Sequence, residues 1–163
     1  MMEAEDWIER LGMEEHPEGG MYVETWRSPR RVDVARNGER VRRDASTAIY
    51  YLLRAGEVSV FHRLASDEVW HHYDGGDLLL HVLSTDGGYE CHRIGIGPDA
   101  LPQRTVPAGD WFAAEPADQT DFVLCGCTVA PGFEFDDFEL TDADDLLDRF
   151  PDHTELIRRL GRG

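Results

Sequence analysis

The stretch VSVFHRLASDEVWHHYDG, residues 58–75, carries the most informative pattern in the chain. Its side chains that can bind a metal or move a proton include His62, Asp67, Glu68, His71 and His72. Together with Gly56 its spacing is G-x5-H-x-L-x3-E-x6-G, which is typical of a metal site, except that Leu64 stands where a second histidine is expected. The stretch is therefore a metal site, the remains of one, or a pocket with another use.

Alternation within this stretch predicts two short strands. Residues two apart share one face of a strand, so His62 and Leu64 point the same way. Glu68, Trp70 and His72 share a face of the next strand, and a hairpin would bring Glu68 close to His62. A carboxylate beside an imidazole orients it and raises its pKa, which suits proton transfer near neutral pH. We therefore expect a paired histidine and glutamate inside a barrel.

Other side chains supply predicted contacts to a ligand. Trp70 and Trp111 offer flat apolar surfaces that suit the face of a sugar ring or a base. Arg27 lies in a predicted strand, where it either pairs with Glu24 on an exposed edge or clamps a carboxylate or phosphate inside a pocket. Gln103 either hydrogen-bonds a ligand or makes only a loop contact.

The overall composition limits the class of protein. The chain has 163 residues, of which 41% are apolar, enough for one domain with a core. It has no apolar run of about 18 residues, so no membrane-spanning helix is expected. The first residues, MMEAEDWIERLG, are acidic and amphipathic rather than basic and then apolar, so we expect a cytoplasmic protein without an export signal.

The charge balance is strongly acidic. Asp and Glu total 33, whereas Lys and Arg total 16, all of them Arg, for a net charge of −17. Binding a phosphate backbone or an anionic membrane needs a cationic face, so neither a nucleic acid nor a membrane is an expected partner. An acidic chain without Lys is typical of a salt-rich cytoplasm, where counterions screen self-repulsion, and we interpret the chain as halophilic.

Short strands make up most of the chain. After MYVETWR come TAIYYLL, EVSVFHRL, EVWHHY, DLLLHVLS, YECHRIG, RTVPAG, DWFAAE and DFVLCGCTVA, separated by turn residues. The Arg-rich segment 28–45 contains Asn37-Gly38 and predicts a hairpin tip or a flexible excursion. Helices are predicted over 3–11 and, each opened by a capping box, twice within 141–161. This order indicates a single all-β domain over 1–163, with a barrel core at 20–140 and short N- and C-terminal helices.

Four blocks of the chain resemble one group of the cupins. HPEGGMYVETWRS, FHRLASDEVWHHYDG, VPAGDWFAA and GCTVAPGFEFDDFEL are similar, in this order, to small cupins described as predicted sugar epimerases. The resemblance spans residues 11–140 and implies the double-stranded β-helix, or jelly-roll barrel, of that superfamily. Its usual motifs have histidine at positions 62, 64 and 112 and glutamate at 68, whereas this chain has Leu64 and Phe112.

These departures weaken the expectation of a metal. Leu64 and Phe112 cannot coordinate, so His62 and Glu68 are the two family ligands that remain. Stable transition-metal sites usually take about three or four protein ligands. If His72 faces inward, it would complete a weak divalent-metal site with His62 and Glu68. We expect no tightly bound cofactor.

The resemblance also implies a relation to cupin-fold sugar-nucleotide epimerases. These enzymes use a histidine to remove a proton next to a carbonyl, and a tyrosine to supply one from the opposite face. His62 would then be the base, with Glu68 beside it, and Tyr73, Tyr50 and Tyr51 are candidate acids. The expected function is a sugar- or sugar-nucleotide-directed epimerase or isomerase. The alternatives are a cupin that binds a small molecule without chemistry and a metal-dependent cupin enzyme.

A homodimer is also expected. The strand MYVETWR would leave an exposed sheet edge, which pairing across a two-fold axis removes. The habit of the family supports the same expectation, with a small carbohydrate-like molecule as the other partner.

Overall fold

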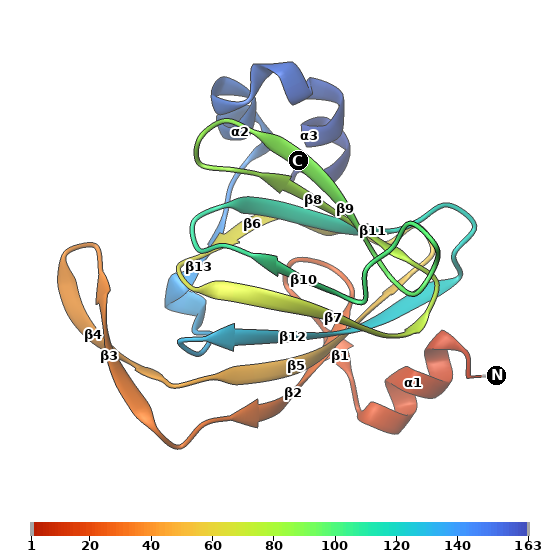
Figure 1. The fold of residues 1–163 in the computed structure, drawn as a ribbon, viewed down its shortest axis with the longest axis horizontal. Coiled ribbons are helices and arrows are strands. Elements are labelled where there is room, and N and C mark those ends of the chain that lie inside the picture. Colours follow the sequence, from red (N-terminus) through yellow and green to blue (C-terminus); the bar gives the residue numbers. More distant parts are fainter. Residues whose placement is uncertain (1, 163) are drawn as a thin grey trace.

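The computed structural model describes residues 2–162, in which two antiparallel sheets face each other across a core (Figure 1). In spatial order the large sheet contains β1 (Glu14–Glu15), β2 (Met21–Arg27), β5 (Thr47–Arg54), β12 (Phe122–Ala130), β7 (Asp67–Gly75) and β10 (Gln103–Val106). The small sheet contains β13 (Phe138–Leu140), β6 (Ser59–Leu64), β11 (Trp111–Pro116), β8 (Leu78–Leu83) and β9 (Tyr89–Ile94). This arrangement confirms the predicted jelly-roll barrel.

The main core fills the space between the two sheets. Strand alternation sends Trp70 of β7, Leu80 of β8 and Phe112 of β11 inward, and each is at most 1% exposed. Burying one such side chain contributes about 1.5–3 kcal/mol, so this interior is the chief source of stability. The cavity described below opens from the same interior.

Helices cover the outer faces of both sheets. The helices α2 (Ala143–Arg149) and α3 (Thr154–Leu160), separated by the 3-10 turn η2 (Pro151–His153), lie on the small sheet. The helix α1 (Ala4–Leu11) packs Trp7, Ile8 and Leu11 toward Leu52 and ends at Gly12, whose positive φ of 65° closes the helix. None of the helices within residues 2–162 is long and apolar enough to cross a membrane.

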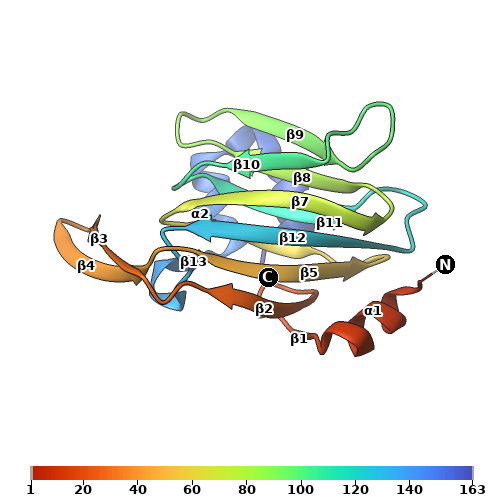
Figure 2. The same cartoon turned by 60° about the horizontal axis from the view of Figure 1, so that its bottom comes forward.

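A two-stranded hairpin projects from the body. It consists of β3 (Arg31–Arg36) and β4 (Glu39–Asp44), and Figure 2 shows it extending beyond the end of the sheets. Asn37 and Gly38 at its tip both have positive φ, as a tight hairpin turn requires. The predicted hairpin is therefore confirmed, and Arg43 ties it to the body through Asp137 at 2.8 Å.

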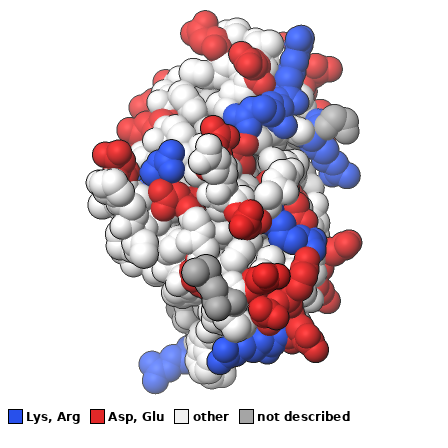
Figure 3. Space-filling model, turned by 90° about the vertical axis from the view of Figure 1, so that its right-hand side faces the viewer, with Lys and Arg blue, Asp and Glu red and all other residues white. Residues whose placement is uncertain are grey.

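The C-terminal part of the chain corrects one local prediction and adds one strand. Neither α2 nor α3 has a side-chain hydrogen bond at its N-cap, so the predicted capping boxes do not form. The segment after β12 forms the 3-10 turn η1 (Phe135–Asp137) and then β13, which adds to the small sheet beside β6. On the face shown in Figure 3, acidic side chains lie in several places, with Arg side chains among them.

Candidate functional site

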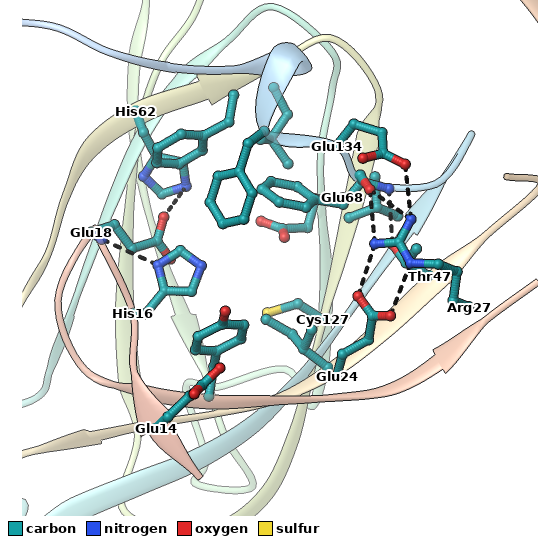
Figure 4. Close-up of a pocket in the computed structure, with 17 residues that line it drawn as sticks. Glu14, His16, Glu18, Glu24, Arg27, Thr47, His62, Glu68, Cys127 and Glu134 are labelled. Atoms are coloured by element: carbon teal, nitrogen blue, oxygen red, sulfur yellow. Dashed lines mark hydrogen bonds and ion pairs between the residues drawn. The ribbon is translucent and has the colours of Figure 1, made fainter. Parts of the chain in front are cut away.

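A cavity of about 140 Å³ opens between the sheets at the His62 end of the barrel. Figure 4 shows its lining side chains converging on one space, with His62, Glu18 and His16 on one side and Arg27, Glu24 and Glu134 on the other. The lining consists of Glu14, His16, Glu18, Tyr22, Glu24, Arg27, Thr47, Ile49, His62, Leu64, Glu68, Cys127, Val129, Phe133, Glu134, Phe135 and Phe138.

His62 is the central residue of one wall, and both of its ring nitrogens are occupied. Its Nδ1 lies 2.8 Å from the Val60 carbonyl oxygen, which can only accept, so Nδ1 carries a proton. Its Nε2 lies 2.8 Å from Glu18 Oε2, and the ring is 2% exposed. No lone pair of His62 is therefore free to take a proton from a ligand.

Glu18 reaches the cavity because the chain turns sharply after β1. Gly19 and Gly20 have φ of 106° and 75°, and a Cβ at Gly19 would collide with the carbonyl oxygen of Val58. The Val60 amide then donates to the Glu18 carbonyl at 2.9 Å, which holds the turn against β6. The dipeptide Gly19-Gly20 was the one sequence signal that this turn approaches another strand closely.

Glu18 and His62 form a buried ion pair. Burial alone would raise the pKa of Glu18, but the charge and hydrogen bond of His62 outweigh it and leave that pKa below 4.5. Burial alone would lower the pKa of His62, but Glu18 outweighs it and leaves that pKa above 6.5. His16 adds a second contact to Glu18 at 3.7 Å, and burial lowers the pKa of His16, so that ring is neutral.

Glu68 does not hold His62, which corrects the prediction of a His62–Glu68 pair. The strands β6 and β7 follow each other in the chain but belong to different sheets, so they do not form the expected hairpin. Glu68 Oε2 instead accepts a hydrogen bond from Trp70 Nε1 at 3.0 Å. Its other oxygen, Oε1, has no hydrogen-bond partner within residues 2–162, and Glu68 belongs to the cavity lining.

The protonation of Glu68 differs from that of an ordinary glutamate. Burial, followed by the charge of Glu18, raises the pKa of Glu68 from 4.5 to about 8. The side chain is 7% exposed, and the charge of His62 offsets only part of this effect. Glu68 is therefore mostly a neutral carboxylic acid at pH 7, able to donate a proton and to accept one as the pH rises.

Arg27 lines the cavity but cannot clamp an anion, because its hydrogen-bond donors are already in use. Its Nε and Nη2 bind both oxygens of Glu24 at 2.9 and 2.8 Å. Its Nη1 binds Asp44 at 2.9 Å and Glu134 at 3.0 Å, and both terminal nitrogens contact the Phe133 carbonyl oxygen. The role of Arg27 here is to join β2, the hairpin base and the segment after β12.

Two predicted ligand-binding aromatics are buried away from the ligand space. Trp70 lies in the main core and touches the cavity only through its hydrogen bond to Glu68. Trp111 faces outward from β11 and packs beneath α2 and α3, with Arg63 over its ring at 4.8 Å. Strand alternation explains the correction for Trp111. Adjacent residues on a strand point to opposite faces, and Phe112 is the one that points inward.

The tyrosines predicted as acids also lie outside the lining. Tyr73 is 53% exposed, at a bulge in β7, and contacts Tyr50 on the outer face of the sheet. Tyr51 is 1% exposed and donates its hydroxyl to the Gly19 carbonyl, and burial raises its pKa well above 10. Tyr22 is the tyrosine that lines the cavity, and the sequence reasoning missed it.

His72 and Gln103 are not brought to the cavity either. His72 Nε2 contacts the Gly76 carbonyl oxygen at 3.0 Å, and Gln103 is exposed on β10, where its amide lies 3.2 Å from His71. The three residues of the expected weak metal site therefore do not converge. Within residues 2–162 no group of three or more His, Cys, Asp or Glu side chains could hold a metal ion.

The metal positions of the cupin motifs are filled by apolar side chains. Leu64 and Phe112 are 5% and 1% exposed, and the Phe112 ring lies 4.1 Å from the His62 ring, centroid to centroid. An isobutyl group and a phenyl ring supply no lone pair for a metal. The residues present do not fit the usual metal of this fold.

Comparison with known proteins agrees with this fold. The cupin superfamily (DUF985) matches residues 5–141. The chain belongs to the cupin superfamily. This cupin is 30% identical over 145 residues to an uncharacterized protein from Saccharomyces cerevisiae, a match that covers 81% of the chain and 72% of the yeast protein.

Solved structures show the same arrangement. A hypothetical protein from Leishmania major is 36% identical, with a TM-score of 0.91 and coverage of 99% of this cupin and 100% of that chain. A Shewanella oneidensis protein is 38% identical, with a TM-score of 0.87 and coverage of 99% of both chains. Bacillus subtilis oxalate decarboxylase shares the fold alone. It is 12% identical, with a TM-score of 0.55 and coverage of 90% of this cupin and 36% of that chain.

Proposed function

We propose that this cupin is a sugar isomerase or epimerase that moves a proton at the carbon next to a carbonyl group. The observation that supports the proposal is that Glu68 is a buried carboxyl in the cavity lining, and that its Oε1 has no hydrogen-bond partner within residues 2–162. Its pKa of about 8 allows both protonation states near neutral pH, as a group that accepts and returns a proton requires. His62 has no free nitrogen for this task, so Glu68 replaces it as the candidate base.

The proton transfer can be written with one group. The Glu68 carboxylate removes the proton from the carbon beside the carbonyl. The electron pair of the broken C–H bond forms a C=C bond, and the π pair of the carbonyl moves to its oxygen, giving an enediolate. The proton of the neighbouring hydroxyl then passes to that oxygen, the C=O bond re-forms at the hydroxyl-bearing carbon, and Glu68 returns its proton to the former carbonyl carbon, which isomerises an aldose to a ketose. Returning a proton to the opposite face of the same carbon would epimerise it, and Tyr22 is the lining tyrosine available for that step.

The size and charge of the cavity favour a single sugar over a sugar nucleotide. A cavity of about 150 Å³ holds a ring as large as benzene, so about 140 Å³ suits a single ring. A diphosphate needs free cations, whereas Arg27 is engaged with three carboxylates and His62 with Glu18. We therefore propose a monosaccharide-sized substrate.

Exchange of deuterium from solvent into aldoses and ketoses tests the proposal. The wild-type chain should place deuterium at the carbon next to the carbonyl, at a rate that rises with pH as Glu68 ionises near pH 8. Glu68→Gln should reduce exchange by about 10²–10⁴-fold, the usual effect of losing a general base. Glu155→Gln, an exposed change on α3, is the matched control and should exchange like wild type.

The other outcomes identify the alternatives. Exchange that persists in Glu68→Gln would remove the proposed base. Exchange that a chelator abolishes would favour a metal-dependent enzyme. Saturable binding of a sugar without any exchange would favour a cupin that binds and does not catalyse.

A further inference from the structure

The cavity lining carries an excess of negative charge. It contains five glutamates but only one arginine, together with His16 and His62. At pH 7, Glu68 is mostly neutral and His62 is charged, which leaves four carboxylates against two cations. An anionic ligand would meet net repulsion here, whereas a cation would be attracted.

The pairing of these charges shows which ones are available. Arg27 is matched by Glu24 and Glu134, and His62 is matched by Glu18. Two glutamates remain. Glu68 is 93% buried and points its carboxyl group into the cavity (Figure 4), and Glu14 at the opening has no ion-pair partner within residues 2–162.

Aromatic rings stand beside the carboxylates. Phe133, Phe135 and Phe138 contact one another, with ring centroids 5.0 to 6.0 Å apart, and Tyr22 lies 4.5 Å from the His16 ring. The face of an aromatic ring attracts a cation, and a flat apolar face also suits a sugar ring. Phe135 is 53% exposed, so it can contact a ligand at the opening.

We propose that the cavity binds an amino sugar, a monosaccharide-sized ring whose protonated amine lies against Glu68 Oε1 and whose body lies along the phenylalanines. The sugar-like ring rests on the function proposed above, whereas the amine rests on the charge of the lining. An ammonium group supplies the donor that Oε1 lacks and the positive charge that the lining lacks. Hydrogen bonds to charged groups are among the stronger ones in proteins.

Calorimetric titration with three probes of similar shape tests this inference. At pH 7 and constant KCl, D-glucosamine should bind about tenfold or more tightly than D-glucose, and D-glucuronate should bind most weakly. Glu68→Gln should lose the preference for glucosamine, while Glu155→Gln should keep it.

Each remaining outcome overturns the inference. The amine proposal is wrong if glucose or glucuronate binds as tightly as glucosamine or more tightly. It is also wrong if none of the three binds at millimolar concentration. A glucosamine preference that Glu68→Gln keeps would show that Glu68 is not its partner. Deuterium exchange is measured separately, so the two proposals can fail independently. A preference for the amine without exchange would contradict only the isomerase function. Exchange without the preference would contradict only the binding of an amino sugar.

Discussion

Replacing Glu68 by glutamine should stabilise the fold in a way that grows with pH. Glutamine keeps the size of the side chain and an acceptor for Trp70 Nε1, but it cannot ionise. The folded-state pKa of Glu68 is raised from 4.5 to about 8, first by burial and then by the charge of Glu18. The proton that Glu68 holds therefore stabilises the fold fully below pH 4.5, and this contribution is lost as the pH rises through about 8.

The size of the effect follows from the two pKa values. Each pH unit between them changes the free energy of unfolding by about 1.4 kcal/mol. Relative to wild type, Glu68→Gln should gain about 1 kcal/mol at pH 5, about 3 kcal/mol at pH 7 and about 5 kcal/mol above pH 8. This is a large share of the stability of a domain, which is typically about 5–15 kcal/mol.

Urea unfolding at constant KCl measures this difference directly. Both proteins are unfolded at several pH values between 5 and 9, and the extrapolated free energies are subtracted. Glu155→Gln, measured in parallel, should show no pH-dependent difference from wild type. A Glu68→Gln difference that stays constant with pH would show that the pKa of Glu68 is not raised in the folded chain.

Four further predictions concern other parts of the molecule. In Glu18→Gln the buried ion pair loses one partner, so the pKa of His62 should fall below 6.5 in an NMR titration. The free energy of unfolding, measured in urea at pH 6, should fall by about 3 kcal/mol. An unchanged His62 titration would contradict this prediction. The melting temperature should rise with KCl from tens of millimolar to molar, because screening relieves the repulsion of a −17 chain, and flat or falling melts would remove the halophilic interpretation. Leu64→His should not create a stoichiometric metal site by metal analysis, because Phe112 cannot coordinate and both nitrogens of His62 are engaged; a full equivalent of bound metal would refute this. The chain should sediment as a homodimer, and Trp26→Glu should weaken the dimer. The reason is that β1 covers only the first part of β2 and leaves Trp26 56% exposed. A wild-type chain that sediments as a monomer would contradict this prediction.

The fold could be predicted because its signals are local and repeated. Alternation of apolar residues with a period of two, interrupted by turn residues, placed nearly every strand within a residue or two of its observed bounds. Asn37-Gly38 marked a hairpin because few other pairs adopt positive φ easily. The helix caps of α2 and α3 failed because a capping pattern shows what can bond at a helix end, and tertiary packing decides whether it does.

The site was harder to predict because its partners come from distant segments. Alternation along β6 and β7 predicts which of their residues point into the barrel. It does not show to which sheet each strand belongs. Glu68, six residues along the chain and at the motif position for an acid, is therefore the partner that the sequence predicts for His62, whereas the acid that binds it in space is Glu18, from a glycine turn before β2. The prediction for Trp111 is wrong for a simpler reason. Trp111 and Phe112 are adjacent on β11, so they point to opposite faces, and the sequence does not say which of the two points inward.

The loss of metal ligands and the neutral state of Glu68 have one physical cause. In the usual cupin motif, three histidines and a glutamate surround a divalent cation, whose charge would offset the burial of that carboxyl. Here Leu64 and Phe112 fill two of those positions with apolar atoms, so burial acts on Glu68 without a neighbouring metal. His62 offsets little of it, because its charge is matched by Glu18 at 2.8 Å. A proton on Glu68 then takes the place of the missing charge, and any ligand that returns a cation to this point, an ammonium included, releases that proton.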